Sequence, residues 1–154
     1  MSENSGRILL QPLGPLDLAV AATLHASCFD DGWSEAAMAE ILAMPGCTGA
    51  LALAGDQPIG FVIVLAVAAD AEIITLGVLS AFRRRGIGGR LLAWAADRSR
   101  ASGCRRLLLE VAEDNPAARA LYGRLGFSQI GRRPSYYRRS AGTAAAMVLA
   151  RDLD

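Results

Sequence analysis

The chain has 154 residues, a formal net charge of +1, one histidine, three cysteines and no lysine. A P-loop phosphate site and a pyridoxal-phosphate Schiff base both require a lysine, so neither chemistry is available. A nucleophilic triad would have to use His25, and a zinc site with two histidines cannot be built. The cysteines form no Cys-x-x-Cys pair, and the sequence predicts no metal site.

Length and composition predict one globular domain over residues 1–154, with 53% hydrophobic and 20% charged residues. The odd cysteine number favours reduced thiols. The N-terminus lacks a basic segment followed by an apolar one, and the longest apolar run, 61–69, is too short to cross a membrane. We therefore expect a cytoplasmic protein that does not enter a membrane.

The small net charge conceals an uneven distribution. Residues 1–82 carry one arginine and nine acidic side chains, a net charge of −8, whereas residues 83–139 carry fourteen arginines and four acids, a net charge of +10. A segment this basic favours an anionic partner, and the acidic half favours a cationic one.

In chain order, the first half predicts a strand, two helices and three more strands, over 7–13, 15–28, 34–44, 47–54, 59–67 and 72–79. Ser34 is suited to be the N-cap of the second helix, which Pro45-Gly46 ends. The residues expected on its buried side are Ala37, Ile41, Leu42 and Met44. Because short turns separate the three later strands, they are expected to form an antiparallel meander.

The second half alternates between helices and strands. Helices are predicted over 86–101 and 115–125, and strands over 105–112, 127–131 and 143–149. Pro116 suits the first turn of the second of these helices, and Gly126 suits its end. Together the two halves predict a mixed α+β fold.

The segment LGVLSAFRRRGIGGRLL, residues 76–92, places an arginine- and glycine-rich turn between a strand and a helix. Gly86, Gly88 and Gly89 allow a ligand to approach the backbone, and the free N–H groups of the helix start attract anions. Arg84 and Arg85 add positive charge, so the predicted ligand carries phosphate. A dinucleotide fingerprint does not fit, because Leu91 stands where a glycine or alanine is needed.

The turn reads R-x-x-G-x-G from Arg83 to Gly88, and it is followed by LLLEVAEDN (107–115) and ALYGRLGF (120–127). These segments resemble, in order and spacing, the motifs of the GNAT family of N-acetyltransferases. Gly32-Trp33-Ser34 and GRRPSYY (131–137) are similar to the bacterial members that acetylate the N-terminal alanine of ribosomal proteins. The resemblance is strongest over residues 76–137.

The resemblance implies a three-layer α/β/α fold, with four helices around a mostly antiparallel sheet of six or seven strands. It implies acetyl-CoA as the acetyl donor, and a protein N-terminus or peptide, such as that of a ribosomal protein, as the acceptor, with no DNA partner. It also implies roles for individual residues. Glu110 is the general base and Tyr122 the general acid; the donor contacts are Leu76, Gly77, Val78, Arg84, Arg85, Gly86, Ile87, Gly88, Gly89 and Asn115.

Trp33, Tyr136 and Tyr137 correspond to residues at the acceptor groove in this resemblance. As neighbours in an extended segment, the two tyrosines are expected to point in opposite directions. The chain departs from the family pattern at Gly142-Thr143-Ala144, where acidic residues are usual. Glu113-Asp114 is more acidic than usual and would favour a basic substrate.

Each chemical residue also has a structural interpretation. Glu110 is equally compatible with a solvent-facing strand position, and Tyr122 with a core aromatic. His25 is expected to be a structural or a surface helix residue, and Cys104 to be buried rather than nucleophilic.

Two other functions compete with acetylation of a protein. The first is acetylation of a small amine, such as a polyamine or an antibiotic. The second is an arginine-rich module that binds RNA or the ribosome through phosphate contacts. Few aromatic residues are interleaved with the arginines before Tyr136, which argues against the module.

Overall fold

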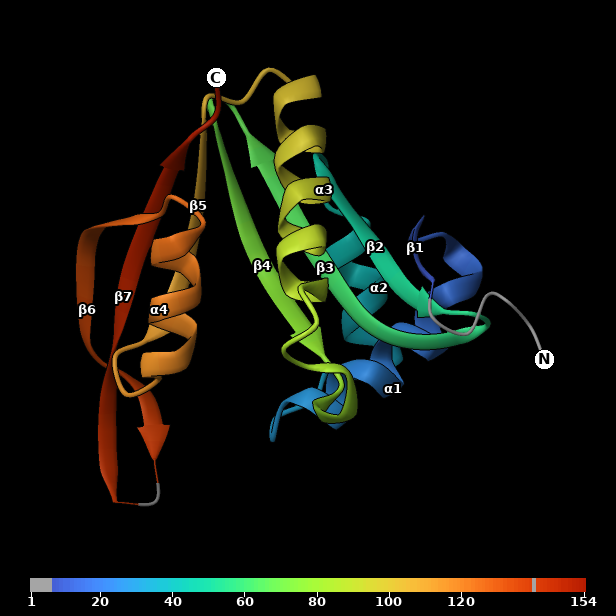
Figure 1. Ribbon diagram of the computed structural model, residues 1–154, viewed down its shortest axis with the longest axis horizontal. Coiled ribbons are helices and arrows are strands. Elements are labelled where there is room, and N and C mark those ends of the chain that lie inside the picture. Colours follow the sequence, from blue (N-terminus) through green and yellow to red (C-terminus); the bar gives the residue numbers. More distant parts are fainter. Residues whose placement is uncertain (1–6, 140) are drawn as a thin grey trace.

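The computed structural model describes residues 7–139 and 141–154. Seven strands form one sheet in the order β1-β2-β3-β4-β5-β7-β6 (Figure 1). All neighbours are antiparallel except β4 and β5, which are parallel. The strands are β1 Ile8–Pro12, β2 Cys47–Ala54, β3 Gln57–Val67, β4 Asp70–Val78, β5 Arg106–Ala112, β6 Ser128–Arg139 and β7 Gly142–Asp152. The mixed α+β fold and the meander over β2–β4 are confirmed.

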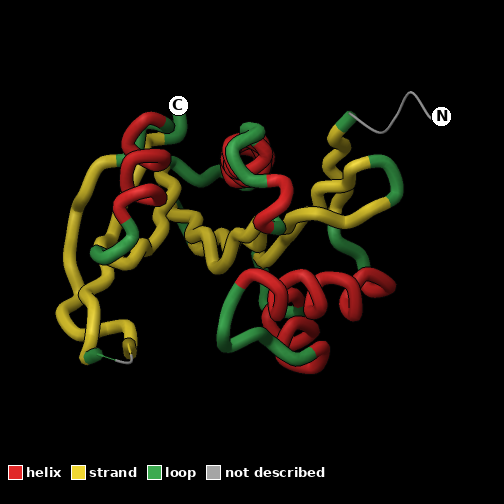
Figure 2. The backbone as a smooth tube through the Cα atoms, turned by 60° about the horizontal axis from the view of Figure 1, so that its bottom comes forward, coloured by secondary structure: helices red, strands yellow, loops and turns green. Residues whose placement is uncertain are grey.

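Helices cover the sheet on both sides, which gives the three layers that the resemblance implies (Figure 2). Two lie on one face, α3 (Ile87–Ala101) and α4 (Pro116–Arg124). On the other face, α1 (Leu18–Cys28) and α2 (Glu35–Leu42) contact β2, β3 and β4. Short 3-10 helices cover Pro15–Asp17 and Ser80–Phe82.

Polar side chains cap the first turns of α2 and α4. Ser34 accepts a hydrogen bond from the Ala37 N–H at 3.1 Å, as its predicted N-cap role requires. The sequence prediction was wrong about Met44, which lies beyond the end of α2 and is 45% exposed. Because α2 ends at Leu42, Met38 fills the buried position instead.

The main core lies between α3 and the central strands. Leu91, Leu92 and Ala95 of α3 are buried at helical spacing, as predicted. Strand β3 is buried over six consecutive residues, 59–64, because helices pack on both of its faces. This part of the sheet therefore forms a rigid support for the turn at the start of α3.

The last two strands are longer than predicted. Strand β6 continues through the 132–137 segment because a bulge accommodates it: Arg133 pairs with Ala146, but the next pair is Tyr137 with Ala144. Three residues of β6 therefore lie opposite one residue of β7, and Ser135 has a positive φ of 54°. The bulge tolerates Pro134, which has no N–H for a regular ladder.

The feature that positions the site is the divergence of β4 and β5. The two strands pair only from Asp70 with Arg106 to Glu72 with Leu108. In the pairing of β4 with β3, Ile73 and Thr75 have partners on β3 but Ile74 has none, so β4 has a bulge at Ile74. A bulge of this kind bends the strand that contains it. Beyond this point β4 and β5 spread apart (Figure 1), which leaves the β5-facing backbone edge of residues 74–78 without a strand partner.

Candidate active site

The turn before α3 has an open backbone surface. Gly86 caps the helix with a φ of 77°, in the left-handed region that favours glycine. A Cβ at Gly86 or Gly89 would meet no atom within 4 Å, and one at Gly88 would meet only Leu76, at 4.0 Å. The glycines therefore leave room for a ligand at the N-terminus of α3, next to the free edge of β4.

Arginines of this turn divide into one that supports the loop and two that are available to a ligand. The Nε of Arg83 donates a hydrogen bond to the Val78 carbonyl at 3.0 Å, which ties the turn to the end of β4. Arg84 and Arg85 are exposed and take part in none of the ion pairs found among residues 7–139 and 141–154. The Arg85 guanidinium lies over the Phe82 ring, 5.1 Å from its centroid, and both arginines place positive charge beside a helix N-terminus, where anions are favoured.

The predicted donor contacts on β4 adjoin this turn. A Cβ at Gly77 would lie 2.8 Å from the Phe61 ring and 3.1 Å from the Cβ of Cys28, so packing requires glycine there. Leu76 and Val78 pack into the main core, as does Ile87 at the start of α3. Their side chains hold β4 and α3 together, and the backbone of β4 remains free on the side of β5.

Glu110 lies on β5 within the diverging region. Its neighbours Leu109 and Val111 are buried in the core beneath α3, so Glu110 points to the opposite face of the sheet. Its side chain is 16% exposed and forms an ion pair with Arg133 of β6, with Nε and Oε1 3.0 Å apart. Glu110 is therefore neither an edge-strand residue nor a fully solvated one.

Two other ionisable groups, Glu72 and Tyr137, lie in the same environment as Glu110. Burial and the negative charge of Glu110 raise the pKa of Glu72, whereas the Arg133 guanidinium lowers it. Burial raises the pKa of the Tyr137 hydroxyl as well, with a further contribution from Glu110. The structure thus gathers groups from β4, β5 and β6 on one face.

Tyr122 lies on the other side of the diverging strands, on α4. Its ring packs against Phe127 in an edge arrangement, with centroids 5.8 Å apart, and contacts the main core. Burial raises the pKa of the Tyr122 hydroxyl, which keeps it protonated at neutral pH. Asn115 caps the same helix, since its Oδ1 accepts a hydrogen bond from the Ala118 N–H at 3.2 Å.

Trp33 is held in the α1–α2 loop by His25. The Nδ1 of His25 accepts a hydrogen bond from the Trp33 N–H at 3.1 Å, and the imidazole stacks on both Trp33 and Phe29, with centroids 4.4 and 4.6 Å away. His25 is 3% exposed, and burial lowers its pKa. Of the two expected roles, structural or surface, the structure supports the structural one. Trp33 and Ile74 of β4 both pack against the cluster of Ala21, Met38 and Ile63, on the face of the sheet to which Glu110 also points.

The tyrosine pair differs from its expected arrangement. Tyr136 and Tyr137 do not point in opposite directions: their rings meet edge to face, with centroids 5.1 Å apart. The reason is the bulge at 134–136, where the positive φ of Ser135 breaks the alternation of an extended strand. Tyr137 is half-buried and Tyr136 is 51% exposed.

The acidic pair after β5 is neutralised within the chain. Glu113 forms an ion pair with Arg132 at 2.9 Å, and Asp114 forms one with Arg139 at 2.8 Å. These contacts connect the β5–α4 turn to β6. Both carboxylates have internal partners, which weakens the interpretation that they attract a basic substrate.

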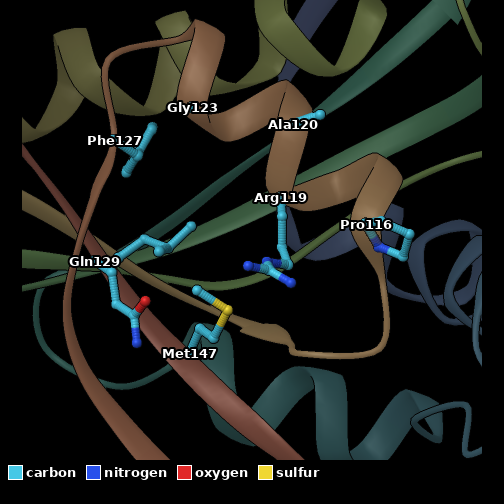
Figure 3. Close-up of a pocket in the computed structure, with 8 residues that line it drawn as sticks. Pro116, Arg119, Ala120, Gly123, Phe127, Gln129 and Met147 are labelled. Carbon is cyan, nitrogen blue, oxygen red and sulfur yellow. The ribbon is translucent and has the colours of Figure 1, made fainter.

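A hollow of about 390 Å³ lies between α4 and strands β6 and β7 (Figure 3). It is lined by Pro116, Arg119, Ala120, Gly123, Phe127, Gln129, Met147 and Leu149, none of which is a predicted site residue. Cys28, Cys47 and Cys104 are free thiols, and Cys104 is buried as expected. Over the described residues, 7–139 and 141–154, no three metal-binding side chains cluster and no helix could span a membrane.

Comparison with known proteins identifies the class. The model of the acetyltransferase (GNAT) family matches residues 18–127, and the chain belongs to this family. The protein is therefore an acyltransferase, and the RNA-binding module is set aside.

Particular relatives are similar over most of the chain. The N-alpha-acetyltransferase RimI of Mycobacterium tuberculosis is 34% identical over 153 residues, covering 96% of this chain and 95% of the relative. The [ribosomal protein bS18]-alanine N-acetyltransferase of Salmonella typhimurium is 36% identical over 97 residues, 63% of this chain and 66% of the relative. The crystal structure of the ribosomal-protein-S18-alanine N-acetyltransferase from Escherichia coli has a TM-score of 0.88 at 26% identity, covering 96% of this chain and 94% of that one.

Sequence reasoning missed two groups that the structure brings to Glu110. Glu72 and Arg133 are 38 and 23 residues away in the chain; Glu72 belongs to no motif, and Arg133 lies within the GRRPSYY segment without having been given a role. No local signal would have joined them, because their proximity depends on the strand order and on where β4 and β5 part.

Proposed function

We propose that the protein transfers an acetyl group from acetyl-CoA to the N-terminal α-amine of a protein. The observation that carries the proposal is the divergence of β4 and β5 between an anion-binding turn and a partly buried glutamate. Family membership and the named activity of the mycobacterial relative support the same reaction.

The donor would occupy the free edge of β4 and the turn before α3. The pantetheine arm carries amide groups, and these would pair with the backbone of Leu76, Gly77 and Val78 as an added strand does. The pyrophosphate would bind the N–H groups of residues 86–89 together with Arg84 and Arg85. Asn115 would add a side-chain contact through its NH2 group, because its Oδ1 already caps α4.

Transfer is direct in this proposal and needs no enzyme nucleophile. The amine nitrogen attacks the thioester carbonyl carbon, the C–S bond breaks, and the amine proton passes to Glu110. The departing thiolate receives the hydroxyl proton of Tyr122. The two groups lie on opposite sides of the diverging strands, so acceptor and thiolate would be served from different faces.

A protein α-amine is the acceptor that the site fits best. With a pKa of about 8, an α-amine loses its proton more readily than a lysine side chain, whose pKa is about 10.4. The face around Glu110 carries Trp33, Tyr136 and Tyr137, which suit contacts to a peptide backbone. The Salmonella typhimurium relative is named for the N-terminal alanine of a ribosomal protein, and we extend that substrate class to this chain.

A panel of acceptors tests the proposal. The enzyme is incubated with acetyl-CoA and either short peptides with free N-termini, the same peptides with blocked N-termini, or small amines, and products are identified by mass spectrometry. We expect one acetyl group on the α-amine of a subset of free peptides and none on the blocked ones. Faster acetylation of a polyamine or an aminoglycoside than of every peptide would favour the small-amine alternative and contradict the proposal.

A further inference from the structure

The face of the sheet that carries Glu110 also carries a cation, Arg133, to which the proposed reaction gives no role. Arg133 contacts Glu110 at 3.0 Å, although its own side chain is 58% exposed and that of Glu110 is 16% exposed. An exposed arginine that reaches a mostly buried carboxylate keeps a positive charge next to it. The bulge that follows immediately, at 134–136, fixes where β6 turns away from regular pairing.

A second carboxylate shares this cation. Glu72 pairs with Leu108 at the last point where β4 and β5 are joined, and Glu110 follows two residues later on β5, on the same face. The charges of Glu110 and Arg133 both act on Glu72, in opposite directions. The groups around Glu110 are thus Glu72 from β4 and Arg133 and Tyr137 from β6, while its β7 partner Val148 carries no charge.

We propose that Arg133 is a positioning residue that acts as the shared counter-ion of Glu110 and Glu72. This inference rests on the proposed function, in which Glu110 is the general base. Without Arg133, the Glu110 and Glu72 carboxylates would have no cation between them to offset their repulsion, and Glu110 would lose the contact that fixes its position. Arg133 therefore holds the Glu110 carboxylate in the position from which it accepts the proton. Its positive charge also disfavours a bound ammonium and so favours the neutral, reactive amine.

Arg132 offers a matched control on the same strand. It pairs with Glu113 at 2.9 Å, with a side chain 50% exposed, and it lies opposite Met147, which belongs to the core beneath α4. Arg132 therefore points to the other face of the sheet. Removing either arginine deletes one cation and one ion pair from β6, but only one of them faces Glu110.

The first test is the pH dependence of kcat/KM for a peptide acceptor. In Arg133→Gln we expect kcat/KM to fall by about tenfold across the pH range, because the base loses the contact that orients it. Arg133→Lys, which restores the charge, should reverse most of that change, and Arg132→Gln should keep the wild-type profile. An unchanged profile in Arg133→Gln, or the same change in Arg132→Gln, would overturn the proposal.

The second test does not depend on activity. Titration of the Glu72 carboxyl by carbon NMR should give a higher pKa in Arg133→Gln than in the wild type, because a cation that lowers it is gone. Arg132→Gln should leave the value unchanged. If the wild type acetylates no amine at all, the proposed function fails, whereas an unaltered Glu72 titration rejects the shared counter-ion itself.

Discussion

The two arms of the sheet are built differently. Strands β2, β3 and β4 contact helices on both faces, and β3 contains six consecutive buried residues. Strands β5, β7 and β6 are covered by α4 on one face only (Figure 2), and no residue of β6 between 128 and 139 is buried. Instead, Arg132, Arg133 and Arg139 attach β6 to acidic residues of β5 and of the turn after it. Burial of apolar surface holds the first arm and also the α4-facing side of β5 and β7, whereas β6 is attached largely through partly exposed ion pairs.

This contrast matches the two substrates of the proposed reaction. A single donor with a fixed shape suits a rigid arm, whose turn and strand edge are set by the core. An acceptor chain needs an open face with polar contacts, which the second arm supplies. Four predictions test this division, beginning with the largest expected effect.

Replacing Glu110 by glutamine should lower kcat by about a hundred- to ten-thousandfold, the range for a lost general base. Acetyl-CoA affinity, measured by calorimetry, should be unchanged because Glu110 faces away from α3. Glu113→Gln makes the same chemical change near the end of the same strand and should retain nearly full activity. Comparable losses in both variants would show that the second arm has no dedicated base.

Tyr122→Phe should lower kcat by about ten- to a thousandfold, because the thiolate loses its proton donor. The phenylalanine ring keeps the edge contact to Phe127, so the thermal unfolding midpoint should barely move. Steady-state kinetics and a melting curve on the same sample separate the two effects. Full turnover would show that Tyr122 is only a core aromatic.

Gly86→Ala should weaken acetyl-CoA binding by at least about tenfold, since a methyl group enters the space left for the phosphates. Gly103 is the control: it follows the other end of α3, has a φ of 86°, and also has no neighbour within 4 Å of an added Cβ. Both substitutions should cost about 1 kcal/mol in unfolding free energy, because alanine is strained at positive φ. Equal loss of acetyl-CoA affinity in both would place the donor elsewhere.

The smallest effect concerns His25, whose pKa is lowered from 6.5 by burial. The unfolded chain then binds more protons, so the unfolding free energy should fall as the pH drops below about 6.5. As the chain has one histidine, His25→Phe should remove this slope. It should also cost about 1 kcal/mol at pH 8, where the hydrogen bond from the Trp33 N–H is lost. Denaturant titrations at pH 8 and at a pH below about 6.5 measure the unfolding free energy of the wild type and the variant. If the variant keeps the pH dependence of the wild type, that dependence does not come from His25.

Sequence reasoning reached the first arm more completely than the second. Helix and strand periods, the Ser34 cap and the glycine turn are local signals, and the predicted elements there agree with the structure within a few residues. In the second arm, the course of β6 depends on a three-residue bulge, and the tyrosine orientation depends on the φ of Ser135. Such properties come from long-range pairing. The motif placed Glu110 on the correct strand, but its partners Arg133 and Glu72 required the folded sheet.

The central claim is that the donor binds as an added strand along β4, next to the start of α3. Residue-resolved hydrogen exchange with and without coenzyme A tests it most directly. We expect slower exchange at two sets of amides. The first are the amides of residues 74–78 that do not bond to β3, and the second are the amides of residues 86–89. Binding that leaves these amides unchanged and protects the hollow beside α4 instead would contradict it.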